Sequence, residues 1–532
     1  MFLYILFMLF VVVFPMKKNS VGAVKRVRSH TKSIVRFAAI ALLLLAQIIL
    51  MCVAIYYLNR YAVLFYVVFD IFSFLIAVPL VAQERNAAYK LYWMSVLLLV
   101  PGVGHLMYFF WGGMLGNRRA HRRIQKAVDA ANEYQCGIRG EGAESVFEAE
   151  PKNKISEYLA GQGFPLYDNT EISYFDVGEK YLADMTERLR DAKKYIFMSF
   201  FIIADGVVWD RMCEILEEKS KAGLRICIMY DDAGSILQLS DSTVVRLKNA
   251  GIEIRNFNPV ERNYQRLFLN FRNHQKIMVI DGEYAYTGGI NISDRYANLV
   301  SPLGHWKDTG IRLHGDGTYA FQLFFIGMWN ASGGNLEPKD YPMVRTATEN
   351  GVRCQSFVDG PSNNPNNPAM DMFMHQILSA REYVDIMTPY LIIDDVMQEV
   401  LILAAKSGVK IRIITPGIPD KKAVGMMTQR HYGKLLAAGI RIFEYTPGFV
   451  HAKLCANEFS ALIGSINMDF RSFFLHYENG VWIPEGEVLQ VISDDFEDTI
   501  TKCKEVTYEE WKHRPLLSKI LQEMLYIIKC QF

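Results

Sequence analysis

The sequence predicts an α/β protein in which two tandem, related domains with mixed, largely parallel sheets follow an α-helical membrane region. Three observations lead to this prediction. Long uncharged apolar stretches occupy the first 115 residues. After them, near-continuous apolar strands alternate with helical stretches, which is typical of sheets covered on both faces. The same order of strands and helices also occurs twice, which indicates pseudo-two-fold symmetry between the two domains.

The bulk composition limits the classes of function. The chain has 532 residues, which suits two or three domains rather than one core. Its net charge is +1, so no overall field favours nucleic acid. Hydrophobic residues make up 51% of the chain, a share that directs attention to membrane segments. The eight cysteines form no C-x-x-C pair and no cluster with zinc spacing, so we expect reduced thiols and no metal.

Residues 1–115 form the predicted membrane region. Phe37–Leu58 is uncharged and long enough to cross a bilayer. Tyr61–Ala82 is a second predicted span, interrupted by Asp70. Leu91–Met114 is a third apolar segment, broken by a Pro-Gly-Val-Gly turn, and we expect it to re-enter the membrane or lie in the interface. Met1–Met16 is apolar but short, so we expect an uncleaved anchor or a marginal span.

Basic clusters set the predicted orientation. One cluster precedes Phe37, and Arg118, Arg119, Arg122 and Arg123 follow the last apolar segment. Both clusters should be cytoplasmic, because positively charged flanks stay on that side. Three full crossings would separate them, so we predict a hairpin of the first two spans. The four arginines are also placed to attract anionic headgroups.

A repeat follows the predicted polar linker, residues 116–153. We assign residues 154–345 to the first domain and residues 346–532 to the second. The paired segments are Ala192–Ile203 with Ala380–Ile393, Lys221–Gly234 with Lys406–Asp420, and Leu247–Pro259 with Leu435–Pro447. Each half therefore reads as buried strands separated by helices, which is the pattern of an α/β domain.

Each half then contains a histidine and a lysine two residues apart. The first segment is FRNHQKIMVIDGEYAYTGGIN and the second is FVHAKLCANEFSALIGSIN. Alternate side chains of a strand share a face, so His274 and Lys276 point the same way, as do His451 and Lys453. A pseudo-dyad can bring the two pairs together. Two histidines and two lysines without thiols form a poor zinc site but a good site for a phosphate diester.

These residue types fit a nucleophilic substitution at phosphorus. The lysines can neutralise the non-bridging oxygens, while one neutral histidine attacks and the other, protonated, gives a proton to the leaving alkoxide. The sequence does not separate these two histidine roles. The small-residue turns should let the backbone approach the phosphate, and the following asparagines should add donors. The residues concerned are Gly288, Gly289 and Asn291 in the first half and Gly464, Ser465 and Asn467 in the second.

The His-x-Lys pattern alone is common. His30-Thr31-Lys32 and His305-Trp306-Lys307 also fit it, but neither is followed by a glycine turn and an asparagine. The informative feature is that two copies lie on repeated strands, each followed by G-[GS]-I-N. Chance repetition is a poor explanation for that combination.

With these two motifs the chain resembles the phospholipase D superfamily, which is marked by two H-x-K-x4-D motifs. Within it the chain resembles the bacterial cardiolipin synthases, from about Arg85 to the C-terminus. The more specific segments are Trp93–Tyr108, Tyr230–Ser235, Gly304–Gly315, Thr388–Asp394 and Asn467–Glu478. The resemblance implies two tandem phospholipase D-type domains.

The resemblance also implies a reaction. One histidine attacks the phosphodiester of phosphatidylglycerol and glycerol leaves; a second phosphatidylglycerol then takes the phosphatidyl group, giving cardiolipin without cofactor or metal. By analogy His274 is the nucleophile, His451 the acid and base, and the two lysines hold the phosphate. Asp308 and Glu478 correspond to the acids that orient the histidines. The implied location is the bacterial cell membrane, multi-pass, with the catalytic domains on the cytoplasmic side.

The second motif departs from the family pattern. The first ends in Asp281, which we count with the His-Lys pairs in the catalytic set. The second reads H-A-K-L-C-A-N-E, with Glu458 where an aspartate is expected. The stretch to the glycine turn is also one residue shorter, so Asn457 or Glu458 is an imperfect substitute. This position lies at the end of the strand, away from the His-Lys face. We therefore expect it to support the site rather than to react.

Other functions share the same motifs. A nuclease is disfavoured by the near-zero net charge and the apolar region. A membrane-bound phospholipase D that uses water, a phosphatidylserine synthase, and an inactive lipid-binding scaffold remain alternatives. The oligomeric state is not predicted. The C-terminal segment Leu516–Phe532 is amphipathic, and we expect it to dock on protein rather than on lipid.

Overall fold

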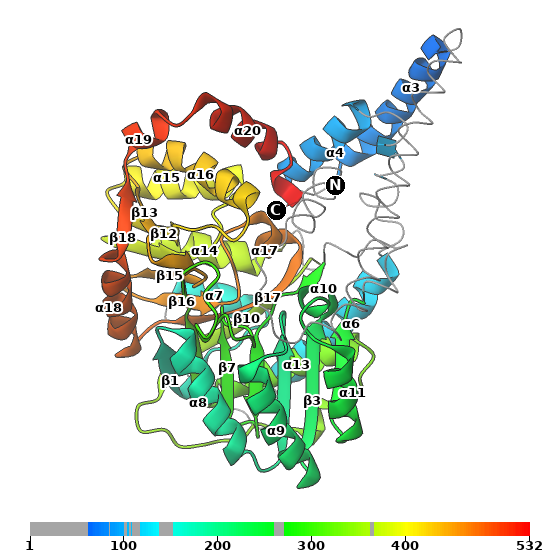
Figure 1. Cartoon of the computed structure of the whole chain (residues 1–532), viewed down its shortest axis with the longest axis vertical. Coiled ribbons are helices and arrows are strands. Elements are labelled where there is room, and N and C mark those ends of the chain that lie inside the picture. The colour runs from blue at the N-terminus through cyan, green and yellow to red at the C-terminus, as the bar shows by residue number, and fades with distance from the viewer. Residues whose placement is uncertain are drawn as a thin grey trace. The chain divides into compact units, whose positions relative to one another are not determined.

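The computed structural model describes residues 62–83, 86–99, 104–105, 108, 118–137, 153–259, 271–361 and 366–531. The chain divides into two compact units. One unit is Met1–Gly112 with Gln531, and the other is Gly113–Cys530 with Phe532. Both predicted catalytic domains lie within the second unit (Figure 1).

The first unit contains two apolar helices, α3 (Ala62–Val81) and α4 (Ala87–Leu99). The Ser73 hydroxyl donates to the carbonyl of Leu97 at 3.2 Å, which ties the helices together. Helix α4 ends before the predicted Pro-Gly turn. In the described residues no helix combines the length and the hydropathy that a membrane crossing needs. Met1–Met16 and Phe37–Leu58 lie outside those residues, so the number of crossings stays a prediction.

Among the described residues, the second unit is built on one mixed sheet of sixteen strands, fifteen along one path and β5 (Arg272–Asn273) paired beside β17. The first half contributes seven strands in the spatial order β4-β3-β2-β6-β7-β9-β1. Their bounds are β1 Tyr167–Phe175, β2 Tyr195–Phe200, β3 Arg225–Asp231, β4 Glu253–Phe257, β6 Ile277–Ile280, β7 Tyr284–Gly288 and β9 Gly310–Gly315.

The second half repeats this order as β13-β12-β11-β15-β16-β17-β10, with β18 added at its edge. The bounds are β10 Val352–Asp359, β11 Tyr383–Met387, β12 Lys410–Pro416, β13 Arg441–Tyr445, β15 Leu454–Asn457, β16 Ala461–Gly464, β17 His476–Ile483 and β18 Cys503–Val506. The strands β1 and β10 pair antiparallel at the centre and join the halves into one sheet. The predicted pseudo-two-fold repeat is therefore visible in the strand order.

The predicted predominance of parallel pairing is wrong. Only β2-β3-β4 and β11-β12-β13 are parallel within the main sheet path, and the other pairings along it are antiparallel. The reason is burial. Strands such as β6, β15 and β16 are buried at every position, so they read as continuous apolar runs although their neighbours are antiparallel.

Helices cover both halves of the sheet (Figure 1). In the first half they are α7 Lys154–Gly161, α8 Gly178–Asp191, α9 Val207–Lys221, α10 Asp232–Ser235, α11 Asp241–Asn249 and α13 Thr318–Ala331. In the second half they are α14 Pro368–Ser379, α15 Asp395–Lys406, α16 Lys422–Ala437, α17 Phe470–Phe474, α18 Val488–Ile500, α19 Tyr508–Lys512 and α20 Leu516–Tyr526.

The predicted linker contains a helix, α6 (Arg118–Gly137). It packs closely on α13, because a Cβ atom at Gly327 would lie 3.3 Å from the Cα of Val128. Helix α13 is apolar on nearly all sides, since its second face is covered by α6. Of the four arginines predicted to meet headgroups, Arg123 is exposed, and the side chains of the other three lie outside the described residues.

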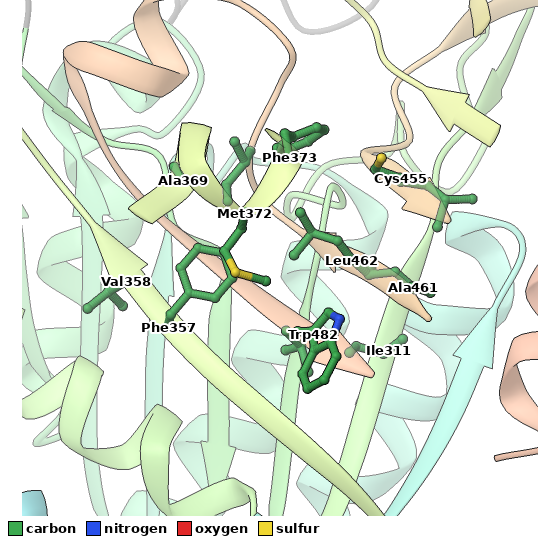
Figure 2. Close-up of a cluster of buried hydrophobic side chains, with 14 of the residues drawn as sticks. Ile311, Phe357, Val358, Ala369, Met372, Phe373, Cys455, Ala461, Leu462 and Trp482 are labelled. Atoms are coloured by element: carbon green, nitrogen blue, oxygen red, sulfur yellow. The ribbon is translucent and has the colours of Figure 1, made fainter. Parts of the chain in front are cut away.

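The hydrophobic core crosses the boundary between the halves. Figure 2 shows Trp482 and Phe357 of the second half in one cluster with Ile311 of the first half. All three side chains are almost fully buried. A core shared in this way fixes the halves to each other, which the site requires because it draws residues from both.

Candidate active site

Two short parallel ladders cross between the halves and position the histidines. In one, β5 (Arg272–Asn273) pairs with the start of β17, and the backbone N–H of His274 donates to the carbonyl of Tyr477 at 2.9 Å. In the other, β14 (Gly448–Val450) pairs with β8 (His305–Lys307). There the N–H of His451 donates to the carbonyl of Lys307 at 2.7 Å. Each histidine is therefore attached to a strand of the opposite half.

The same ladders place each predicted acid beside the histidine of the other half. Glu478, which follows Tyr477, lies against His274: its two carboxylate oxygens are 2.9 and 3.0 Å from Nδ1. The hydroxyls of Ser465 and Ser472 also donate to Glu478, at 2.5 and 2.8 Å. A carboxylate that receives this many hydrogen bonds is held in one orientation and fixes the imidazole ring.

The reciprocal pair joins Asp308 of the first half to His451 of the second. Asp308 Oδ2 lies 2.6 Å from Nδ1 of His451, and the other oxygen accepts from the N–H of Thr309 at 2.9 Å. In both pairs the Nδ1–H is the donor, because a carboxylate only accepts. Each ring therefore presents Nε2 as its remaining reactive nitrogen.

The two lysines are buried beside the histidines. Lys276 Nζ donates to the carbonyl of His274 at 2.5 Å, and Lys453 Nζ donates to the carbonyl of His451. The exposed fraction is zero for Lys276 and 2% for Lys453. Full burial of two ammonium groups is costly unless a counter-charge is present. Glu478 and Asp308 supply part of that charge, and a bound phosphodiester would supply more.

The electrostatics follow from this burial. Burial, and then the positive charges of Lys276 and Lys453, lower the pKa of His274 well below its ordinary value. Burial and the same lysines also lower the pKa of His451. Burial lowers the pKa of Lys453 to about 8 and raises the pKa of Asp308 to about 7. Lysines of both halves act on each histidine, so the two His-Lys pairs lie close together.

The turns at Gly289 and Ser465 support the two acids in different ways. A Cβ atom at Gly289 would overlap Oδ1 of Asp308 and lie 2.9 Å from the carbonyl oxygen of His451, so only glycine leaves room for that pair. At the corresponding position Ser465 fits and donates to Glu478. Glu478 therefore receives a hydrogen bond from the Ser465 hydroxyl, whereas Asp308 occupies the space that a side chain at position 289 would fill.

The two predicted phosphate-binding asparagines are engaged by loop contacts. Asn291 accepts from the N–H of Ile202 at 3.0 Å, and its amide donates to the Tyr296 hydroxyl at 2.7 Å. The Asn467 amide donates to Asp469 at 3.0 Å. These contacts hold loops beside the histidines. A direct bond from either amide to phosphate stays a prediction.

Asp281, predicted as part of the catalytic set, lies at the far end of β6 from His274. Its carboxylate accepts from the backbone N–H groups of Lys193, Lys194 and Tyr195 at 2.7–2.9 Å. It therefore holds the start of β2 and does not reach the reaction centre. Its left-handed backbone, with φ 56°, is a conformation that aspartate tolerates in turns.

Glu458 makes the corresponding contacts in the second half. Its carboxylate accepts from the N–H groups of Arg381, Glu382 and Tyr383 at 2.5, 3.1 and 3.4 Å, at the start of β11. The extra methylene of glutamate compensates for the residue that the second motif lacks. Asn457 instead stabilises the adjacent turn through the N–H groups of Phe459 and Ser460, both at 2.9 Å.

Trp306 and His476 are among the aromatic side chains at the site that the sequence reasoning missed. The Trp306 ring packs on His451 with centroids 5.3 Å apart, and His476 packs on His274 at 5.2 Å. Each stands two residues before an acid, Asp308 or Glu478, and so shares the face of that acid in an extended strand. This spacing, present in both halves, is the signal that could have found them.

His274, His476 and Glu478 bring ligand atoms within 4.8 Å of one another, a spacing that could hold a metal ion. Hydrogen bonds account for most of these groups, and His476 Nδ1 lies 3.5 Å from Glu478 Oε1. Arg471 Nε donates to His476 Nε2 at 3.1 Å, and Glu478 already receives His274 and two hydroxyls. Buried lysines beside the group also oppose a cation. The donor set fits the observed hydrogen-bond network better than it fits a metal.

Comparisons with known proteins agree with this arrangement. The family model described as "Cardiolipin synthase, PLD-like domain" matches residues 185–301 and 373–500, and the model "Phospholipase_D-nuclease N-terminal" matches residues 62–113. An uncharacterized protein of Streptococcus mutans is 34% identical over 452 residues, covering 83% of this chain and 96% of that protein. Cardiolipin synthase 2 of Bacillus anthracis is 30% identical over 466 residues, covering 85% and 89%.

A solved structure supports the fold. The crystal structure of phosphatidylserine synthase from Haemophilus influenzae has a TM-score of 0.55 at 14% identity, covering 71% of this chain and all of that chain. The two His-Lys pairs, their exchanged acids and the matches over most of the chain lead to one classification. The chain belongs to the cardiolipin synthase family of the phospholipase D superfamily, a family of phosphatidyltransferases.

Proposed function

We propose that the protein is a cardiolipin synthase, which transfers the phosphatidyl group of one phosphatidylglycerol to a second and releases glycerol. The observation that carries this proposal is the buried site itself: two histidines, each held by an acid of the opposite half, with a buried lysine beside each. The names of several relatives, cardiolipin synthases from Bacillus and Staphylococcus, support the same substrate class.

In the first step His274 attacks phosphorus through Nε2. Its Nδ1–H is committed to Glu478, and its lowered pKa keeps the ring neutral and nucleophilic. The N–P bond forms and the bond from phosphorus to the glycerol oxygen breaks. His451 gives the proton that the departing alkoxide needs. The charges of Lys276 and Lys453 stabilise the non-bridging oxygens as negative charge builds on them.

In the second step a hydroxyl of another phosphatidylglycerol attacks the phosphatidyl-histidine. His451 now takes the proton of that hydroxyl, the new O–P bond forms, and the N–P bond to His274 breaks. The products are cardiolipin and the restored enzyme. Asp308 and His451 lie 2.6 Å apart and act as one pair: burial raises the pKa of Asp308 to about 7, so the pair can hold the transferred proton near neutral pH although the imidazole alone is a weak base.

Burial of the reacting groups favours a lipid hydroxyl over water. His274 and His451 are each only 6% exposed, and their rings contact the aromatic rings of Phe201, Trp306 and Tyr296. Apolar walls limit the water that can compete for the phosphatidyl-histidine. Because both substrates reside in a leaflet, we place the protein at the bacterial cell membrane as a multi-pass protein with its catalytic part cytoplasmic.

The test is an assay of the full chain in phosphatidylglycerol vesicles, with cardiolipin and glycerol measured together. We expect equal amounts of both, abolished in His274→Ala. His314→Ala is the matched control, because His314 stacks on Tyr284 outside the site and its loss should leave turnover intact. Trapped phosphatidyl-histidine should accumulate on His274 in a His451→Ala variant after acid quench.

Other products of the assay would contradict the proposal and identify a different activity. Phosphatidic acid without cardiolipin would identify a phospholipase D. Serine-dependent turnover of an activated phosphatidyl donor would identify a phosphatidylserine synthase. Lipid binding without any product would identify a scaffold, and would mean that the altered second motif abolishes the reaction.

A further inference from the structure

One face of helix α20 packs on protein and the other is exposed. One face docks on protein: Leu525 and the following Ile528 pack against Ile392, Val424 and Met427, and Gln522 is buried. Figure 1 shows α20 beside α16, which it contacts. Glu523 also pairs with Arg430 of α16 at 2.5 Å. The prediction that this segment docks on protein therefore describes only half of the helix.

The other face is an exposed apolar stripe. Leu516 is 72% exposed, Leu517 67% and Met524 58%. The stripe as a whole consists of Leu516, Leu517, Ile520, Leu521, Met524 and Ile527. The spacing of three and four residues puts these side chains along one side of the helix. Contiguous exposed apolar surface of this kind marks an interaction site, unlike an apolar side chain that is exposed singly.

The chemistry of the stripe favours lipid over a protein partner. Its side chains are all aliphatic or thioether, whereas the centres of protein interfaces are enriched in aromatic residues and arginine. Residues 511–531 contain four Lys or Arg and one Glu, which gives this segment an excess of positive charge. Lys512 at the start of the segment is exposed. An aliphatic stripe with basic neighbours matches the boundary between acyl chains and anionic headgroups.

The docked face connects this stripe to the reaction centre. Tyr390 packs against the same cluster as Leu525 and Ile528. Its ring lies 6.3 Å from that of Phe449, which in turn lies 5.9 Å from His451. A continuous series of packed side chains, from the cluster under α20 through Tyr390 and Phe449, thus connects this helix to His451. Contact between α20 and a membrane would therefore bring the lipid surface near the site.

We propose that α20 is an interfacial helix that binds the surface of an anionic phospholipid membrane through Leu516, Leu517, Ile520, Leu521, Met524 and Ile527. The proposal deepens the proposed function, since it rests on a lipid substrate. It adds a second membrane contact, on the catalytic unit itself, to the predicted N-terminal spans.

The test reports contact with lipid directly and does not depend on turnover. Ile520→Cys, labelled with an environment-sensitive dye, is reconstituted as the full chain in vesicles containing phosphatidylglycerol. Leu403→Cys is the matched control, because Leu403 is 58% exposed on α15 and lies outside the stripe. Labelling of the native cysteines is measured on the unsubstituted chain and subtracted. Iodide quenches dye in water, and doxyl-labelled phospholipid quenches dye in the bilayer.

We expect lipid quenching and iodide protection at position 520, and the reverse at position 403. Replacing phosphatidylglycerol by phosphatidylcholine should weaken lipid quenching at 520 at least twofold. Iodide quenching at 520 equal to that at 403 would overturn the proposal. Protection from both quenchers would also overturn it, because the stripe would then be covered by protein, either the N-terminal region or a second copy. Failure of the cardiolipin assay would leave the quenching result interpretable.

Discussion

At the scale of single residues, the site depends on partners that are distant in sequence. His274 is oriented by an acid 204 positions later, and His451 by an acid 143 positions earlier. The lysines bond locally, to the carbonyls of histidines two residues away, and share the charge of the same two acids. Local spacing thus builds each His-Lys pair, and the tertiary fold supplies each acid.

Removing the Asp308 charge should slow the reaction and change the pH dependence of stability. We expect Asp308→Asn to lower kcat by roughly 10²–10⁴-fold, because a neutral amide replaces the ionisable carboxylate that accepts from Nδ1–H of His451. The pKa of Asp308 is raised from 3.8 to about 7. The folded protein therefore binds the extra proton, and this contribution to stability is present below about pH 4 and lost as pH rises through 7. The free energy of unfolding of the parent should fall relative to the variant across that window, as measured by denaturant titration.

Glu458→Ala tests the altered second motif. The loss of three accepted backbone hydrogen bonds at the start of β11 should lower the free energy of unfolding by about 1–3 kcal/mol. The turnover of the folded enzyme should change by less than about threefold, because Glu458 does not contact the histidines. Glu458→Gln keeps an acceptor and is the control. A fall in kcat of a hundredfold with unchanged stability would contradict this supporting role.

At the scale of elements, two short ladders decide whether the site exists. The pairings β5–β17 and β8–β14 involve only two or three residues each, yet they carry both histidines across the boundary between the halves. Short pairings are weak alone, so packing of the surrounding core must hold them. Their shortness also explains why no strand pattern in the sequence indicated them.

A methyl group at Gly448 should separate one of these ladders. A Cβ atom there would overlap the backbone of His305, which is too close for the pairing of β14 with β8 to survive. We expect Gly448→Ala to lower kcat at least tenfold, because His451 would move away from Asp308. Gly161→Ala is the control, since a Cβ atom there meets nothing within 4 Å. Vesicle turnover, normalised to folded protein by circular dichroism, checks the prediction.

At the scale of the whole molecule, the two halves are one folding unit. They share the β1–β10 pairing, a common core and the exchanged acids. Neither half alone contains a complete histidine–acid pair. The catalytic unit is therefore more constrained than two domains joined by a flexible connection, and its site cannot open by simple separation of the halves.

Expressing residues 1–345 and 346–532 as separate fragments tests whether the two halves form one folding unit. Each fragment expressed alone should be inactive, and co-expression should restore turnover, because the halves reassemble through β1 and β10. Thermal unfolding of the intact catalytic unit, followed by fluorescence, should show one transition. Activity in either fragment alone, or two well-separated transitions, would contradict the shared sheet and core.

The sequence by itself determined the repeat, the two His-Lys pairs and the family. These features depend on local spacing and on segments that recur, so they can be read along the chain. The strand directions could not be read, because buried antiparallel and parallel strands have the same apolar pattern. Which acid serves which histidine, and the packing of Trp306 and His476 on the rings, were decided only by the tertiary structure. The physical reason is that these contacts join residues of opposite halves, and their geometry exists only once the shared sheet and core have formed.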